Sequence, residues 1–280
     1  MPGRRRWWRS SSMSIPEDAI ERLAGSPVIR QSRFAGGDIS GASEVALADG
    51  RTIVAKHGPV VGIEARMLEA MAESAAPIPR VIGYGDDVLL IEHVAGNGSL
   101  SGEAWFSLAD ALNGLHDEAG PDYGWDEDYA LRHVAVENDR LDDWPRFWAE
   151  RRLLCHIPHL ASDLAHRIEA LGARLCEILP ADPTPCLLHG DLWGGNVLVA
   201  GSRIAGLIDP CAYYGHREVD AATLTVFDHP PEAFFARLEL EPGWQDRQPV
   251  YRLWTWLLHV RLFGDGYRSA VERELATLGF

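Results

Sequence analysis

The order of hydrophobic and polar residues predicts that a strand-rich region opens the chain. Ser14, Pro16 and Glu17 have the form of a capping box with a proline in the first turn, so a helix is expected to run to about Leu23 and to stop at Gly25. Short runs of apolar and β-branched residues, bounded by glycine, proline and aspartate, predict five strands, at 28–34, 42–48, 51–57, 80–84 and 88–94.

The residues between these runs indicate how the strands are joined. Asp49 and Gly50 are a strong signal for a two-residue hairpin turn, and residues 85–87 form a second hairpin turn. Over 60–74 apolar residues recur at helical spacing until Pro77 ends the pattern. The first part of the chain is therefore expected to be a small, mostly antiparallel sheet with one packed helix.

After a connector at 96–99 the pattern changes to that of long amphipathic helices. These are expected at 103–117, 144–155, 162–179, 216–227, 231–238 and 248–262, and a hairpin over 197–208 is the one predicted strand pair among them. The pattern predicts an α+β protein with an N-terminal lobe at 14–94 and a helical C-terminal lobe at 95–280. Residues 1–13, rich in arginine and serine, are expected to be a disordered leader, with Met13 a candidate native start.

The composition excludes several classes of protein. With 280 residues, 46% of them hydrophobic, the chain can bury a large core, and a net charge of −15 repels nucleic acid and anionic membranes. No apolar run approaches the roughly 20 residues of a membrane span. The four cysteines show no C-x-x-C pairing, which favours buried reduced thiols over a disulfide or zinc site. A monomeric cytoplasmic protein is expected.

The most informative motif is the loop from His189 to Asn196, which is followed by Asp209 after the predicted hairpin. Carboxylate and amide oxygens suit Mg²⁺, so Asn196 and Asp209 are candidate metal ligands. Asp191 would orient an acceptor hydroxyl and take its proton, with position mattering more than basicity in a loose phosphoryl-transfer transition state. His189 is expected to anchor the loop. The alternative, in which Asp191 caps a turn, is disfavoured because apolar runs flank the loop on both sides.

A phosphoryl-transfer site also needs cations on the phosphates. Lys56 ends the third predicted strand, where it would reach the nucleotide phosphates, and Glu64 in the next helix is its expected partner. A glycine-rich turn lies between the first and second predicted strands, and it is either a phosphate loop or a plain turn, its candidate residues being Gly36, Gly37, Ile39 and Ser40. The segment from Glu92 to Val94 is expected to offer backbone groups to adenine.

The runs 189–196 and 208–220 resemble the fructosamine kinase (ketosamine-3-kinase) family, and more distantly aminoglycoside phosphotransferases and choline kinases. Trp193 and the run from Tyr213 to Asp220 are the discriminating features, and the runs 144–153 and 262–267 extend the resemblance over most of the chain. The phosphate loop departs from the family pattern, because Ala35 and Ser40 stand where the family usually has glycine and asparagine.

The resemblance implies a bilobal protein-kinase-like fold that uses ATP and Mg²⁺ to phosphorylate a sugar hydroxyl of ketosamines, a deglycation repair activity. It implies that Asp191 is the catalytic aspartate, that Lys56 and Glu64 hold the phosphates, and that Asp220 braces the catalytic loop. The acceptor stays open between small ketosamines and glycated protein. Two other hypotheses also stay open: an aminoglycoside- or choline-kinase-type phosphotransferase, and a catalytically silent nucleotide-binding protein.

The acceptor pocket is less defined by the sequence. Sugar rings stack on aromatic side chains, so Trp193, Tyr213 and Tyr214 are candidates for this pocket, although each is also compatible with the core. Glu218 is a candidate partner for the cationic ketosamine nitrogen. His216 is either a substrate contact or the start of the following helix.

Overall fold

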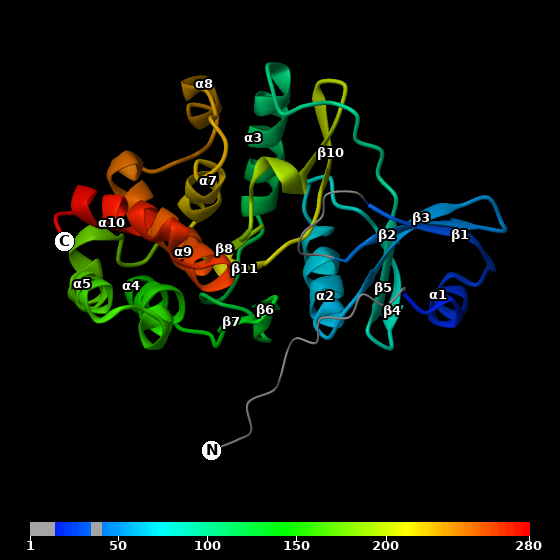
Figure 1. Ribbon diagram of the computed structural model, residues 1–280. Coiled ribbons are helices and arrows are strands. Elements are labelled where there is room, and N and C mark those ends of the chain that lie inside the picture. The colour runs from blue at the N-terminus through cyan, green and yellow to red at the C-terminus, as the bar shows by residue number, and fades with distance from the viewer. Residues whose placement is uncertain (1–14, 35–40) are drawn as a thin grey trace.

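The computed structural model describes residues 15–34 and 41–280, and it places a sheet-containing part beside a larger helical part (Figure 1). The leader, Ser14 and the glycine-turn residues Gly36, Gly37, Ile39 and Ser40 lie outside the described residues. The elements of the first part are α1 Glu17–Ala24, β1 Val28–Arg33, β2 Ser43–Leu47, β3 Thr52–His57, α2 Val61–Met71, β4 Val81–Gly85 and β5 Val88–Glu92.

The five strands form one antiparallel sheet in the order β1-β2-β3-β5-β4. The predicted strands, the helix at 61–71 and both hairpin turns are thereby confirmed. Helix α1 ends where Gly25 takes the left-handed conformation with φ 68°, as the position of this glycine predicts.

Strand β5 explains how the two helices are held on the sheet. Its side chains alternate between faces, and both faces are buried. Val88 and Leu90 pack in the cluster that contains α1, whereas Leu89 and Ile91 pack in the cluster that contains α2. Lys56 of β3 is paired in register with Leu89, so its side chain points to the α2 side of the sheet.

The second part begins at α3. Its elements are α3 Glu103–His116, β6 Tyr129–Leu131, β7 Val134–Val136, α4 Trp144–Phe147, η1 Trp148–Leu153, η2 Leu154–His159, α5 Ser162–Gly172, α6 Leu175–Ile178, β8 Cys186–Leu188, η3 Gly194–Asn196, β9 Val197–Ala200, β10 Arg203–Leu207, β11 Tyr213–Gly215, α7 Glu218–Leu224, α8 Glu232–Phe235, α9 Trp244–Phe263, η4 Asp265–Tyr267 and α10 Arg268–Thr277.

This part differs from the sequence-based expectation at several elements. The helix predicted over 144–155 is a composite of one α-helical turn, a π-helical segment and a 3₁₀ segment, because Trp148 and Arg152 are both fully buried and tertiary packing sets the local geometry. The helix predicted over 162–179 is two helices. Helix α10 was not predicted. The strand pairs β6–β7 and β8–β11 were not predicted either, since three-residue strands carry too little alternation to be recognised.

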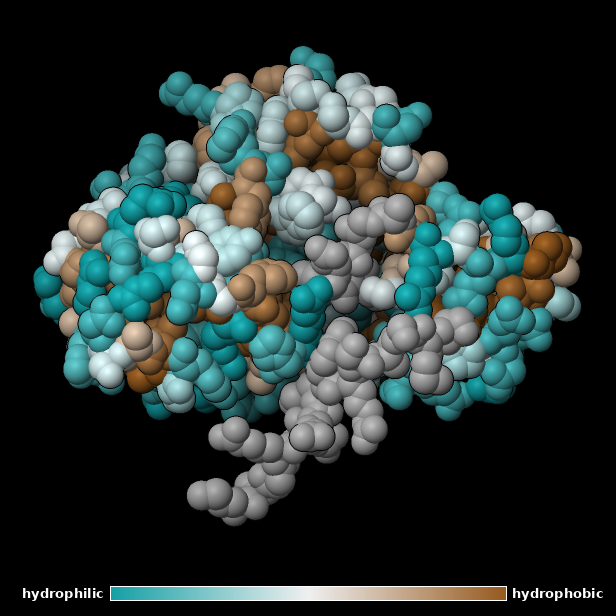
Figure 2. Space-filling model, viewed as in Figure 1, coloured by the Kyte–Doolittle hydropathy of each residue, from teal (hydrophilic) through white to brown (hydrophobic). Residues whose placement is uncertain are grey.

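One large core holds the helical part together. It is rich in aromatic side chains, with Trp144, Trp148, Tyr213, Tyr251 and Trp254 all buried. The visible face of the molecule is mostly hydrophilic on both flanks, and hydrophobic side chains gather at the top centre, near α3 and β10 (Figure 2). Within residues 15–34 and 41–280, none of the helices combines the length and the apolar composition needed to cross a bilayer.

Candidate active site

The loop after β8 turns sharply at Gly190, and only glycine fits there. Gly190 has φ 77°, and a Cβ atom at this position would lie 2.0 Å from the carbonyl oxygen of Cys211. A side chain would therefore displace either this loop or the chain before β11. The glycine of the motif is a geometric requirement of the turn that presents Asp191.

A buried carboxylate holds the same turn from beneath. The two oxygens of Asp220, in α7, accept hydrogen bonds from the backbone amides of His189 and Gly190, each at 2.9 Å. His116 Nε2 of α3 lies 3.0 Å from the same carboxylate. Asp220 is completely buried, and these donors keep its pKa below the ordinary value although burial alone would raise it.

His189 links the loop to the strand end that carries Asp209. Its Nε2 donates to the carbonyl oxygen of Ile208 at 2.9 Å, so its Nδ1 is the acceptor for the amide of Asp191 at 3.3 Å. Burial lowers the pKa of His189, which keeps the ring neutral and suited to this donor–acceptor arrangement.

The structure brings Asp191 and Asn196 together. Asn196 Nδ2 donates to the backbone carbonyl of Asp191 at 2.8 Å, which commits the amide nitrogen and leaves the amide oxygen as the group available to a cation. Burial, followed by the negative charge of Asp209, raises the pKa of Asp191 to about 7. With this pKa, the carboxylate of Asp191 is a stronger base than an ordinary aspartate.

Asp209 meets Lys56 across the cleft between the two parts of the molecule. Lys56 forms ion pairs with both Glu64 of α2 and Asp209. Burial by itself disfavours charge on Lys56, but the two carboxylates outweigh it and raise the pKa of this ammonium above its ordinary value. Asp209 has φ 54°, a left-handed backbone that is uncommon for residues other than glycine and that functional sites often retain.

These side chains line one cleft of about 1210 Å³. Residues from the sheet-containing part form one side, among them Lys56, Glu64, Glu92 and Val94, and Asp191, Trp193, Asn196 and Asp209 come from the helical part. No sequence motif marks several of the lining residues, among them Tyr129, whose buried hydroxyl interacts with Glu64, and Arg132 in the β6–β7 turn.

Trp193 is the candidate acceptor contact that the structure places in the cleft. Its side chain is 42% exposed, and its ring meets Phe227 edge-on with centroids 6.3 Å apart. Phe227, His259, Phe263 and Tyr267 also line the cleft, so an aromatic wall extends from the catalytic loop to α9 and η4. The one sequence signal for this wall is the run 262–267, through its resemblance to the family.

The other four candidate acceptor contacts lie away from the cleft, so the structure does not support their predicted role. Tyr213 and Glu218 are completely buried, and His216 is nearly so. Tyr213 lies under the guanidinium of Arg152. Glu218 is ion-paired with Arg247, and Nδ1 of His216 lies 2.7 Å from the hydroxyl of Tyr251. Tyr214 is half-buried and stacks on Trp125. Packing inside the helical part occupies these side chains.

Comparison with solved structures defines the class of protein. The chain superposes on an aminoglycoside phosphotransferase complexed with ADP and hygromycin B with a TM-score of 0.66 at 17% identity, covering 94% of this chain and 96% of that one. At this identity the likeness concerns the fold alone. A Thermobifida fusca protein named as a putative fructosamine-3-kinase matches with a TM-score of 0.85 at 27% identity, over 93% and 97% of the two chains. The fold is the bilobal kinase-like one.

Sequence comparison then identifies the family. The fructosamine kinase family model matches residues 16–278, and the chain belongs to that family. A protein of Thermus thermophilus, named as a probable ketoamine kinase, is 32% identical over 253 residues, which is 86% of this chain and 91% of the relative. The chloroplastic protein-ribulosamine 3-kinase of Arabidopsis thaliana is 30% identical over 74% of this chain and 68% of its own length.

Proposed function

We propose that this protein is an ATP-dependent kinase that phosphorylates a sugar hydroxyl of ketosamines. Family membership supports the reaction, and one arrangement in the structure carries the proposal. Lys56 bridges Glu64 and Asp209 at the wall of the cleft into which the loop of Asp191 and Asn196 also projects. A cation for phosphates, oxygen ligands for a metal and a base for the acceptor thus occupy one cavity.

ATP would lie with its adenine near the backbone of Glu92 to Val94 and its phosphates near Lys56. Glu64, itself buried, keeps the Lys56 ammonium in place and charged. The predicted contribution of Gly36, Gly37, Ile39 and Ser40 lies outside the described residues.

The donor set of Asn196 and Asp209 fits Mg²⁺, because both offer hard oxygen atoms and the amide nitrogen of Asn196 is already committed to Asp191. These two residues would hold the ion, and the bound ion would neutralise charge on the transferred phosphate. The phosphates of a bound nucleotide would then compete with Asp209 for the positive charge of Lys56.

Asp191 would orient the acceptor hydroxyl and receive its proton. Its backbone is fixed by Asn196, His189 and the turn at Gly190, so its carboxylate is held at a set position. Burial and the negative charge of Asp209 raise the pKa of Asp191, and a cation held by Asp209 would offset the second of these effects. Positioning is therefore the larger part of its role. Trp193 offers an exposed aromatic face for the sugar.

The proposal is tested by a panel of acceptors incubated with the protein, Mg²⁺ and labelled ATP. The panel contains fructosyl and ribulosyl adducts of amines, an aminoglycoside and choline. Transfer of label to ketosamines alone is the expected result. Label on an aminoglycoside or choline without any ketosamine product would contradict the assignment, and ATP binding without transfer to any acceptor would indicate a silent nucleotide-binding protein.

A monomeric enzyme that acts in the cytoplasm is part of the proposal. The support for the location is chemical, since all four cysteines are free thiols, as is usual in a reducing compartment, and two of them, Cys186 and Cys211, are buried. Sedimentation of the purified protein tests the oligomeric state, and fractionation of native cells tests the location.

A further inference from the structure

We infer that Arg132 selects ketosamines that carry a carboxylate close to the amine, the adducts of free amino acids, over adducts of amines and of lysine side chains in proteins. The inference rests on the proposed function and names the class of its acceptor. Arg132 lines the same cleft as Asp191, and no sequence motif assigns it a role.

A continuous series of ring contacts connects Arg132 to the catalytic loop. Trp193, two residues after Asp191, contacts Phe227, whose ring centroid lies 5.0 Å from that of His259. The centroid of His259 lies 5.3 Å from that of Phe263. The guanidinium carbon of Arg132 lies 5.5 Å from the centroid of Phe263. The wall that begins at the reacting end of the cleft therefore leads to a fixed positive charge.

The backbone of Arg132 is held in a conformation that favours glycine. Arg132 has φ 52° in the two-residue turn between β6 and β7, where Leu131 pairs with Val134. His133, next in the turn, lies with Nε2 3.2 Å from the carbonyl oxygen of Arg261, which attaches the turn to α9. A two-residue hairpin turn requires a positive φ at this position, so the turn geometry fixes where the side chain of Arg132 leaves the backbone.

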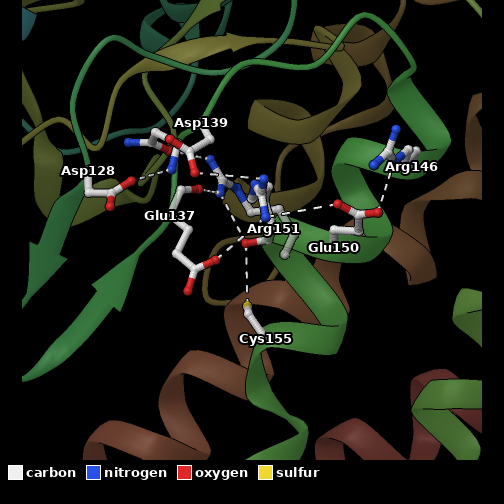
Figure 3. A network of polar contacts seen from close by, with 9 residues as sticks. Asp128, Glu137, Asp139, Arg146, Glu150, Arg151 and Cys155 are labelled. Atoms are coloured by element: carbon white, nitrogen blue, oxygen red, sulfur yellow. Dashed lines mark hydrogen bonds and ion pairs between the residues drawn. The ribbon is translucent and has the colours of Figure 1, made fainter. Parts of the chain in front are cut away.

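The base of the β6–β7 hairpin is fixed as well (Figure 3). Arg151 of η1 lies between the carboxylates of Glu137 and Asp139, at 3.7 Å from each, just after β7. Asp128, just before β6, accepts a hydrogen bond from the amide of Asn138 at 2.8 Å. The two ends of the hairpin that carries Tyr129 and Arg132 into the cleft are thus joined to each other, and the end after β7 is also tied to η1.

The chemistry of this wall matches a zwitterion. The nitrogen of a ketosamine is a secondary ammonium at neutral pH, and cations bind over aromatic faces such as those of Trp193, Phe227 and Phe263. A guanidinium presents paired donors that match a carboxylate. The adduct of a free amino acid carries both charges a few bonds apart. In glycated protein the carboxylate of the modified lysine is part of a peptide bond, so that charge is missing.

The test compares two acceptors that differ in the group beside the amine, a carboxylate in fructosyl-valine and an uncharged amide in fructosyl-valinamide, with peptide-bound fructosyl-lysine as a third. For the unaltered protein we expect kcat/KM for the carboxylate to exceed that for the amide by about tenfold or more, the effect of one charge-assisted hydrogen-bonded pair. This comparison uses only the unaltered protein, so it tests the inference even if the Arg132 variant does not fold.

In Arg132→Gln the ratio of the two kcat/KM values is expected to fall to about one. Arg203→Gln, which removes one exposed positive charge on β10, is the matched control and should keep the original ratio. Equal use of both acceptors by the unaltered protein, or an unchanged ratio in Arg132→Gln, would overturn the inference and leave the proposed function standing. Failure to phosphorylate any of the three ketosamines would overturn both.

Discussion

Asp220 and Gly190 are joined by a 2.9 Å hydrogen bond from the backbone amide to the buried carboxylate, and this bond holds the turn that presents Asp191. The carboxylate also accepts from His189 and faces His116. A structural side chain thus determines where the candidate catalytic side chain lies.

Replacing Asp220 by Ala should destabilise the protein by about 3 kcal/mol, because buried donors lose their acceptor and cannot reach water. Asp220→Asn keeps one acceptor oxygen and should cost less. The free energy of unfolding in urea measures both. Asp139→Ala, which removes an exposed carboxylate 3.7 Å from Arg151, is the control and should change stability by less than about 1 kcal/mol. Equal effects in the buried and exposed variants would contradict the role of Asp220.

Gly190→Ala should abolish turnover and destabilise the protein by about 3 kcal/mol, since the added Cβ meets the carbonyl of Cys211. Gly201→Ala is the matched control. Gly201 also has a positive φ, 63°, but open space surrounds its position, so only the backbone strain of about 1 kcal/mol is expected. Turnover and urea unfolding distinguish the two variants. Full activity in Gly190→Ala would show that the turn tolerates a side chain.

Lys56→Met should lower kcat/KM for ATP by about 100-fold or more, because a cation on the phosphates is lost. It should also lower stability, since Glu64 is then buried without its partner. Adding Glu64→Leu should restore part of the stability and none of the activity. Steady-state kinetics and urea unfolding separate the two effects. A double variant less stable than Lys56→Met alone would contradict the account of this ion pair.

Acid should destabilise the protein below about pH 6.5. Burial, aided by nearby positive charges, lowers the pKa of both His156 and His216 to about 3, whereas the unfolded chain binds protons near 6.5. The unfolded state therefore holds more protons between these values. The stability that the neutral rings contribute is fully present above about pH 6.5 and is lost as pH falls toward 3.

The unfolding midpoint measured against pH checks this expectation. His156→Leu removes one of the two groups and should make the decline between about pH 6.5 and 4 shallower. A decline of unchanged steepness in this variant would mean that the titration of His156 does not contribute.

The sequence was sufficient to predict the sheet, its hairpins and the residues that the structure brings together around Lys56. These depend on local signals: period-two alternation, turn residues, and a loop whose residue types match a known chemistry. Asp191 and Asn196 are near in sequence, and Lys56 and Asp209 follow from strand ends that the fold aligns.

The acceptor side was harder to predict because sequence proximity does not give side-chain direction. Tyr213, His216 and Glu218 follow the catalytic loop closely, but β11 and the start of α7 direct them into the core. Arg132 and Phe227 come from distant segments with no motif, and tertiary packing alone places them in the cleft. Recognising them required knowledge of which segments meet.

The central claim is that Asp191 serves phosphate transfer to a ketosamine, and one measurement tests it most directly. Phosphorylated product formed from labelled ATP and a fructosyl-amine is quantified for the unaltered protein and for Asp191→Ala, with ATP affinity measured on both by calorimetry. We expect product from the unaltered protein, a loss of at least about 1000-fold in Asp191→Ala, and similar ATP binding. Undiminished product formation by Asp191→Ala would contradict the account.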